Sequence, residues 1–205
     1  MKTALSLGLM IISGSALASA PNSELTVSGT IKTPSCTVTS SNSGTYEFGQ
    51  ISASTLGRSE TALPSKTQTY TVVCDASTYL TFKTVDNRSN SVSSPSATKF
   101  GLGRNVDGYV GYYTGKVKNA TVDGDKSKVM RSQNTSFVAN DEVDLTNNPA
   151  EVIGWAESNN VLKLGTSFAA DVEITPYLSK ASEFGDIVGD VQLDGSATMN
   201  FAFGI

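Results

Sequence analysis

The chain has 205 residues and carries 19 acidic against 15 basic side chains and no histidine, so its formal net charge is -4. A net acidic chain lacks the basic surface that phosphate backbones need, and we therefore expect no nucleic acid partner. Without histidine the usual catalytic base is missing and no nucleophile motif replaces it, so the sequence predicts neither an enzyme nor a cofactor.

The N-terminus has the pattern of a secretory signal peptide. An apolar run over residues 4–12 is followed by small residues of the A-x-A type that end at Ala18. The run is shorter than the roughly twenty residues that a membrane span needs, and nothing later in the chain is apolar enough to span a bilayer. We therefore expect a signal peptide over residues 1–18 and one exported domain over residues 19–205, with no membrane span in the mature chain.

Cys36 and Cys74 are the only cysteines. An even count in an exported chain predicts a disulfide bond, which on the chain-entropy estimate contributes about 4 kcal/mol for a loop of this length. A metal site made by two cysteines is the rival interpretation. The chain has no histidine and no second cysteine pair to complete the ligand set, so the sequence predicts no metal site.

Alternation of apolar and polar residues predicts strands along most of the chain. The first is expected over residues 25–32, ending before Pro34, and shorter ones over 36–38 and 46–51. Further strands are predicted over residues 67–74, 79–85, 100–103, 109–113, 152–155 and 168–174, the last ended by Pro176, with weaker fragments at 129–130 and 137–138. No window outside the signal peptide has a helical period. Many short strands with glycine and serine turns predict an all-β sandwich of immunoglobulin-like type.

The most regular alternation is at the C-terminal end of the chain, over residues 193–205. One row is apolar or small and the intervening row is mostly polar, which is typical of a strand with one buried face. The apolar row consists of Leu193, Gly195, Ala197, Met199, Phe201, Phe203 and Ile205. Since no residues follow to pair with it, this strand is expected to have an open edge, and an open apolar edge invites a strand from elsewhere.

The order of motifs in the chain resembles that of pilins of the chaperone-usher class. The resemblance lies in a glycine-containing first strand, a cysteine, a short apolar-Gly-x-apolar strand, a second cysteine, and a glycine that opens a C-terminal strand ending in an aromatic residue. In this sequence the matching stretches are Leu25 to Ile31, Cys36 to Val38, Phe48 to Ile51, Tyr70 to Cys74, and Gly195 to Phe203.

The resemblance implies an incomplete immunoglobulin-like sandwich that lacks its final strand. It implies that a periplasmic chaperone lends a strand during folding, and that another pilus subunit replaces it after export through an outer-membrane usher. The chain would then pass through the periplasm to a fimbrium on the cell surface and serve adhesion. In such recognition, main-chain pairing gives affinity and alternate side chains set the register. The resemblance places the receiving edge on Leu193, Ala197, Met199, Phe201, Phe203 and Ile205.

The source of a donated strand is open at this point. Only residues 19–24 precede the first predicted strand, and they carry no large apolar side chain. Either Leu25, Val27 and Ile31 themselves form a donor segment, or the chain accepts a strand without giving one. The second case fits a terminating subunit or a pilin-like periplasmic protein that does not polymerise. A closed sandwich that binds a small ligand is a further alternative.

Other motifs favour structural roles. Residues 123–127 begin like a calcium loop but lack its central glycine and closing glutamate, which indicates a solvated turn. The carboxylates of residues 141–144 are expected on a charged surface loop. The tyrosines of residues 109–113 are expected to alternate between core and surface, and Trp155 is expected in the core.

Overall fold

The computed structural model of the protein describes residues 22–30 and 33–204. The chain divides into two units, Met1–Lys32 and Thr33–Ile205. The predicted signal peptide lies outside the described residues, as do Ile31 and Ile205. The cleavage site and the boundary of the mature domain therefore stay predictions.

The N-terminal segment does not form the first strand that its alternation predicts. Residues 22–30 have exposed side chains and no regular secondary structure, and Leu25 and Val27 are each 89% exposed. The first strand of the domain begins instead at Cys36. Alternation shows only that a segment can pair as a strand, and in its described part this segment has no strand partner.

The domain is built almost entirely of strands, with three short 3-10 helices over Ser41–Gly44, Ala53–Thr55 and Ser89–Ser91. In chain order the other elements are β1 Cys36–Ser40, β2 Thr61–Ala62, β3 Lys66–Asp86, β4 Phe100–Gly101, β5 Gly111–Val122, β6 Asp125–Lys126, β7 Lys128–Ser132, β8 Glu142–Asp144, β9 Val152–Ser158, β10 Val161–Leu162, β11 Gly165–Leu178, α1 Ala181–Phe184 and β12 Ala197–Gly204.

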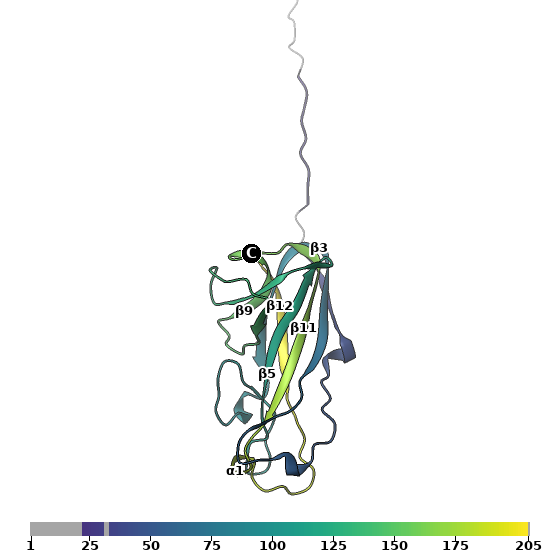
Figure 1. Ribbon diagram of the computed structural model, residues 1–205. Coiled ribbons are helices and arrows are strands. Elements are labelled where there is room, and N and C mark those ends of the chain that lie inside the picture. Colours follow the sequence, from purple (N-terminus) through teal and green to yellow (C-terminus); the bar gives the residue numbers. More distant parts are fainter. Residues whose placement is uncertain (1–21, 31–32, 205) are drawn as a thin grey trace, which may run out of the picture. The chain divides into compact units, whose positions relative to one another are not determined.

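The long strand β3 belongs to both layers of a β-sandwich. Its first half pairs with β1 on one side and β11 on the other, and β11 continues to β5. Its second half pairs with β12 on one side and β9 on the other, and β9 continues to β7. All of these pairs are antiparallel. The axes of strands β3, β5, β11 and β12 have nearly the same direction (Figure 1). The predicted all-β sandwich is confirmed.

The core lies between the two layers and is filled by aromatic and branched side chains from both. Phe168 of β11 and Phe82 of β3 are almost completely buried, and Trp155 of β9 contacts the Phe168 ring with centroids 5.5 Å apart. Full burial of such a side chain contributes about 1.5–3 kcal/mol. The prediction that Trp155 is a core residue is confirmed, and Tyr112 and Tyr113 are also buried.

The disulfide bond joins Cys36 and Cys74, as predicted from an even number of cysteines in a chain expected to be exported. The two cysteines are directly opposite in the register of β1 and β3. The bond therefore holds β1 against the edge of the domain's longest strand. Because the chain leaves β1 directly into the segment that borders the cleft described below, the bond also anchors one side of that cleft.

Several predicted strand limits were wrong. Residues 46–51 and 137–138 form no strand, and the strands predicted at 67–74 and 79–85 are one strand, β3. Pro176 does not end β11, which continues to Leu178. The ring of Pro176 lies beyond Ile174, the last residue of β11 that β3 pairs, so its missing N–H removes no bond between those two strands.

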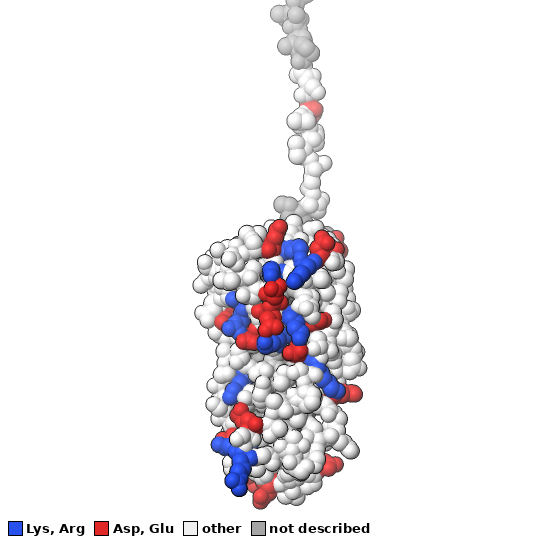
Figure 2. Space-filling view, viewed as in Figure 1, with Lys and Arg blue, Asp and Glu red and all other residues white. Residues whose placement is uncertain are grey.

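The outer face over β5 carries interleaved charges of both signs (Figure 2). Glu142 of β8 pairs with Lys116 of β5, and Glu173 of β11 pairs with Lys118 of β5 at 2.6 Å. Asp141 pairs with Lys128 at 2.7 Å, and this carboxylate cluster is a charged surface, as expected. Within residues 22–30 and 33–204, no group of three or more metal-ligating side chains could hold an ion.

Candidate functional site

The row of apolar side chains on β12 faces the core but is only partly covered. Met199 and Phe201 lie opposite Thr84 and Phe82 of β3, and the rings of Phe201 and Phe82 are 5.3 Å apart. Ala197 at the start of the same row is exposed, and Phe203 near its end is 38% exposed. The row predicted from the sequence is thus a continuous apolar surface with one flank uncovered.

One edge of β12 is open. Among the described residues, β12 pairs with β3 alone, along the whole length from Ala197 to Gly204. Its other edge presents main-chain N–H and C=O groups that no described strand pairs, which is the arrangement that accepts an added strand. The strand is shorter than predicted, since it begins at Ala197. Leu193 lies in the preceding connection and packs against the core from there.

A cleft with a volume of about 380 Å³ runs beside this open edge. One wall is formed by residues 44–46 and Phe48, and the other by Leu193, residues 195–197 and Met199. Its floor is the core itself, made by Tyr70, Thr84, Leu102, Tyr113, Leu145, Val172, Ile174 and Pro176. The cleft therefore opens the space between the two layers of the sandwich along one side.

The wall at residues 44–48 follows β1 but does not continue it as a strand. The turn before it has positive φ angles at Asn42, Ser43 and Gly44, and β1 ends before this turn, at Ser40. Side chains then reach the main chain across the gap: Gln68 donates to the carbonyl of Thr45, and the Lys66 ammonium donates to the carbonyl of Glu47. The segment is therefore held to β3 by side-chain hydrogen bonds and not by main-chain pairing.

Tyr46 anchors this wall to β11, on the far side of β3 from β1. Its hydroxyl donates to the carbonyl of Val172 in β11 at 2.9 Å, and its ring packs against the core. Burial, followed by the neighbouring Tyr70, raises the pKa of the Tyr46 hydroxyl well above its ordinary value. The hydroxyl therefore remains a donor at physiological pH and keeps the wall in place.

Two glycines allow the walls to lie as they do. Gly44 has a φ of +77°, and a Cβ there would also meet the Tyr70 hydroxyl at 3.1 Å. A Cβ on Gly195 would lie 3.0 Å from the Tyr113 ring and 3.1 Å from the Leu102 side chain. Close approach at Gly195 brings the chain down onto the cleft floor just before β12 begins, which explains the glycine in the predicted alternation.

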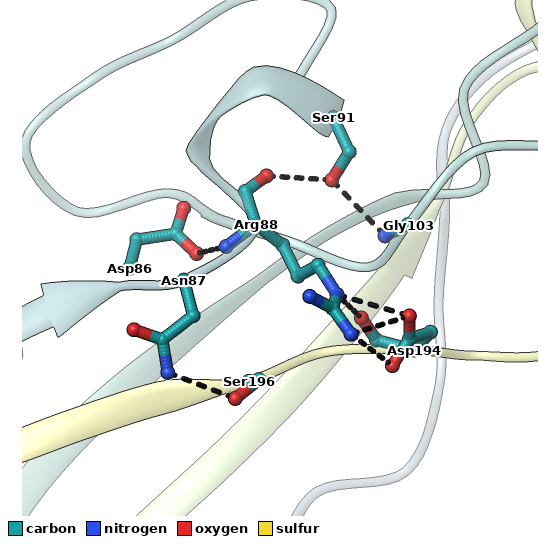
Figure 3. Close-up of polar contacts among 7 residues, drawn as sticks. All are labelled: Asp86, Asn87, Arg88, Ser91, Gly103, Asp194 and Ser196. Carbon is teal, nitrogen blue, oxygen red and sulfur yellow. Dashed lines mark hydrogen bonds and ion pairs between the residues drawn. The ribbon is translucent and has the colours of Figure 1, made fainter.

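A polar network fixes the end of the cleft where β12 begins (Figure 3). The guanidinium of Arg88 makes two hydrogen bonds to the carboxylate of Asp194, at 2.9 and 3.0 Å. Asn87 donates its side-chain N–H to the Ser196 hydroxyl at 2.9 Å. The loop after β3 is thus tied to the connection that leads into β12.

Asp86 is the buried centre of this network. One of its oxygens accepts from the Arg88 N–H at 2.8 Å, and the other accepts from the Gly101 N–H at 2.9 Å. Beside it, the Ser91 hydroxyl donates to the Arg88 carbonyl and accepts from the Gly103 N–H at 3.0 Å. These bonds join β3, the following loop and β4, so they shape the cleft floor as well as its end.

Replacing Asp86 by alanine is expected to lower the free energy of unfolding by about 2–3 kcal/mol. The change leaves two main-chain N–H groups without acceptors, and the one on Gly101 is buried. Asp194→Ala is the matched control, because that carboxylate is largely exposed and its loss should have a much smaller effect. Urea denaturation of both variants tests the ranking, and equal losses would contradict this assignment of Asp86.

The comparisons with known proteins give one match. A family described as "Protein of unknown function (DUF1120)" matches residues 25–121, a little under half of the chain. The matched span includes both cysteines, all of β3 and most of β5, whereas β12 lies outside it. No curated protein matches the chain. The similarity is to a family without an assigned activity, and it names no fimbrial subunit.

The structure gathers most of the predicted site residues at the cleft. Ala197 and Met199 line it, together with Leu193, while Phe201 and Phe203 continue the same row along β12. The other contributors were missed: Tyr46, Tyr70, Thr84 and Tyr113 come from distant segments that meet only in the folded domain. In residues 22–30 and 33–204, no helix is long and apolar enough to cross a membrane.

Proposed function

We propose that this protein is an exported structural subunit of a surface fibre, assembled by strand complementation through a periplasmic chaperone and an outer-membrane usher, and serving adhesion. The observation that carries the proposal is the open cleft, with Met199 in its wall, beside the edge of β12 that no described strand pairs. An extended segment laid there gains main-chain hydrogen bonds from β12 and buries side chains against Met199 and Phe201. Each side chain that becomes fully buried contributes up to about 1.5–3 kcal/mol before ordering costs.

The N-terminal segment supplies a candidate donor. Because the first strand begins at Cys36, the segment before it is longer than the sequence pattern predicts. Leu25 and Val27 are highly exposed and lie in one alternating row that Ile31, outside the described residues, would extend. In this proposal, the donor segment of one copy enters the cleft of another subunit.

Assembly predicts a ladder on an SDS gel. Surface-sheared material, loaded without boiling and probed with antibody to this chain, should show multimers that collapse to monomer on boiling, since long strand pairs resist detergent until heated. A single periplasmic monomer band in both lanes would contradict polymerisation. That band would favour a terminating subunit or a non-polymerising pilin-like protein.

Matched variants identify the two halves of the contact. Ala197→Lys places a cation in the cleft, whereas Ala202→Lys places the same cation on the outward row of β12. Val27→Asp and Ser28→Asp form the corresponding pair on the donor segment. We expect Ala197→Lys and Val27→Asp to remove the ladder and both controls to keep it. If the ladder disappeared in the two control variants alone, the assignment of the inward and outward faces would be contradicted.

A small-ligand-binding function is the second candidate, and the size of the cleft favours it. A volume of about 380 Å³ falls in the range of ligand pockets, and the tyrosines of its floor and wall offer both ring faces and hydroxyls. In that case the chain would accumulate as a stable monomer when expressed without any chaperone. A strand-accepting subunit expressed in the same way should be degraded or aggregate.

A further inference from the structure

Two loops at one end of the domain expose apolar side chains close to each other. Val106 lies in the loop between β4 and β5, and Ile187 and Val188 lie in the connection between α1 and β12. Val106 and Val188 are each 79% exposed, and Ile187 is 45% exposed. These three residues form the end patch. It belongs to the end of the domain that holds α1, whereas the C-terminus lies at the opposite end (Figure 1).

Hydrogen bonds fix the two loops to each other. The side-chain amide of Asn105 is buried and donates to the carbonyls of Phe184 and Asp186, at 3.1 and 2.8 Å. The Tyr109 N–H donates to the Glu183 carbonyl at 2.9 Å. The end patch is therefore presented on a preformed surface, and a contact there needs little ordering of the backbone.

The end patch lies beside the end of the cleft at which β12 begins. The loop of Val106 follows Leu102 and Gly103, and the Leu102 carbonyl accepts from the Asp194 N–H at 2.9 Å. A Cβ on Gly103 would lie 3.2 Å from the Asp194 side chain. Asp194 directly precedes Gly195 in the cleft wall. A strand that runs antiparallel to β12 in the cleft therefore leaves it next to the end patch.

The proposed donor segment is joined to its own domain by a short stretch of chain. Ser35 belongs to the domain, because its N–H donates to the Asp75 carboxylate at 2.8 Å and its carbonyl accepts from the Asp75 N–H at 3.0 Å. Ile31, the last residue of the donor row, is four positions earlier, and four extended residues span at most about 14 Å. Antiparallel pairing is the more stable kind per residue, so a donor paired in this way brings its domain against the end patch.

The charges around the end patch suit the same neighbour. The two loops, residues 104–108 and 185–190, contain one cation, Arg104, and three exposed aspartates, Asp107, Asp186 and Asp190. The connection of the donor copy over residues 32–34 contains one charged residue, Lys32. An acidic surface opposite a basic connection favours this placement of the two copies.

The facing surface of the donor copy is the end of its domain around Ser35. Val73 of β3 is 53% exposed there. Leu164 is 52% exposed, and the residue after it, Gly165, lies opposite Thr78 of β3. This end thus also offers apolar side chains that a contact between domains can cover.

We propose that the end patch receives the domain of a second copy of this chain, the copy whose N-terminal segment occupies the cleft. The inference rests on the proposed function, since the donated strand brings the two domains together. Three side chains are too few to hold free copies together, but a strand-linked neighbour is present at a high effective concentration. Because the two contacting surfaces differ, the contact repeats from copy to copy and extends a fibre.

Photo-crosslinking tests where the neighbouring domain lies. Val188 is replaced by the photoreactive residue p-benzoylphenylalanine, and Thr67, an exposed residue of β3 opposite Glu173 of β11, receives the same replacement as a control. Surface-sheared material is irradiated, boiled and run on an SDS gel. We expect a ladder that survives boiling for position 188 and none for position 67. Mass spectrometry should place the crosslinked partner in residues 32–36, 73–79 or 163–165 of the neighbouring copy.

A charge in the end patch should weaken the assembly without harming the domain. Val188→Asp places a carboxylate in the proposed contact, whereas Thr67→Asp places one on the outer face of β3. At a fixed temperature below boiling, the Val188→Asp ladder should dissociate about tenfold faster than the wild-type ladder, which is the effect of one valine side chain that is no longer buried. Thr67→Asp should match the wild type. Both variants should accumulate normally, because both side chains are exposed.

The outcomes separate this inference from the proposed function. If an unboiled ladder forms but position 188 gives no crosslink, or gives one to another region of the neighbouring copy, the end contact is wrong and strand assembly stands. Equal dissociation rates for Val188→Asp and the wild type contradict the end contact in the same way. Absence of an unboiled wild-type ladder contradicts both strand assembly and this inference. A crosslink from position 188 to the expected residues supports both.

Discussion

Removal of the disulfide bond is expected to lower the free energy of unfolding by about 4 kcal/mol. Cys36 and Cys74 are separated by 38 positions, and a cross-link over such a span restricts the unfolded chain by about that amount. A typical domain is stabilised by only about 5–15 kcal/mol, so the loss is a large part of the total. Urea denaturation of the double variant Cys36→Ala/Cys74→Ala measures it.

Reduction of the wild-type protein is the control for this prediction. Dithiothreitol should destabilise the wild-type chain by a similar amount and leave the double alanine variant unchanged. Unaltered stability of the double variant would mean that β1 is held to β3 by its ladder alone. Because β1 leads into the cleft wall formed by residues 44–46 and Phe48, the proposed strand binding should also weaken on reduction.

The sequence predicts well those strands in which one row of alternate side chains is buried and the other row is partly exposed to solvent. Along β11, buried residues such as Phe168, Ala170 and Val172 alternate with half-exposed ones, as their pattern indicates. β3 shows the limit of this reasoning. The mostly polar residues between Cys74 and Tyr79 look like a turn, yet the strand passes there from one layer to the other. Its support comes from the flanking residues, which pair with β1 and β11 before this stretch and with β12 and β9 after it.

The segments that fail as strands fail for lack of a main-chain partner. Tyr46 and Phe48 alternate and pack against the core, but Gln68 and Lys66 hold the intervening carbonyls through side chains. The described part of the N-terminal segment alternates equally well and forms no strand. Periodicity reports the ability to pair, whereas the existence of a partner depends on the rest of the fold.

The residues of the candidate site likewise fall into those that the sequence pattern predicts and those that only the fold brings together. Ala197, Met199 and Phe201 were predictable because they belong to one regular row close to each other in sequence. Thr84 and Tyr113 were not, because they reach the cleft through strands that the chain places beside β12 from far away.

On the proposed export route, substitution of Phe201 by aspartate is expected to reduce periplasmic accumulation at least about tenfold. The Phe201 ring packs on the buried Phe82, so the variant loses an aromatic contact and places a carboxylate against this apolar side chain. Marginal stability makes abundance sensitive to losses of only a few kcal/mol, because the unfolded chain is degraded. Immunoblots of periplasmic extracts measure the amount.

Asn200→Asp is the matched control, since it adds the same charge one position away on the outward face, opposite Lys83. It should accumulate as the wild type does. If both variants failed to accumulate, β12 would be sensitive to added charge in general. Normal amounts of Phe201→Asp would contradict a buried role for this face.

If the row of Phe201 is what the chaperone covers, then Phe201→Leu, which keeps an apolar side chain, should restore both accumulation and chaperone capture. Restored accumulation without capture would mean that the domain needs this row for its own core and for no partner.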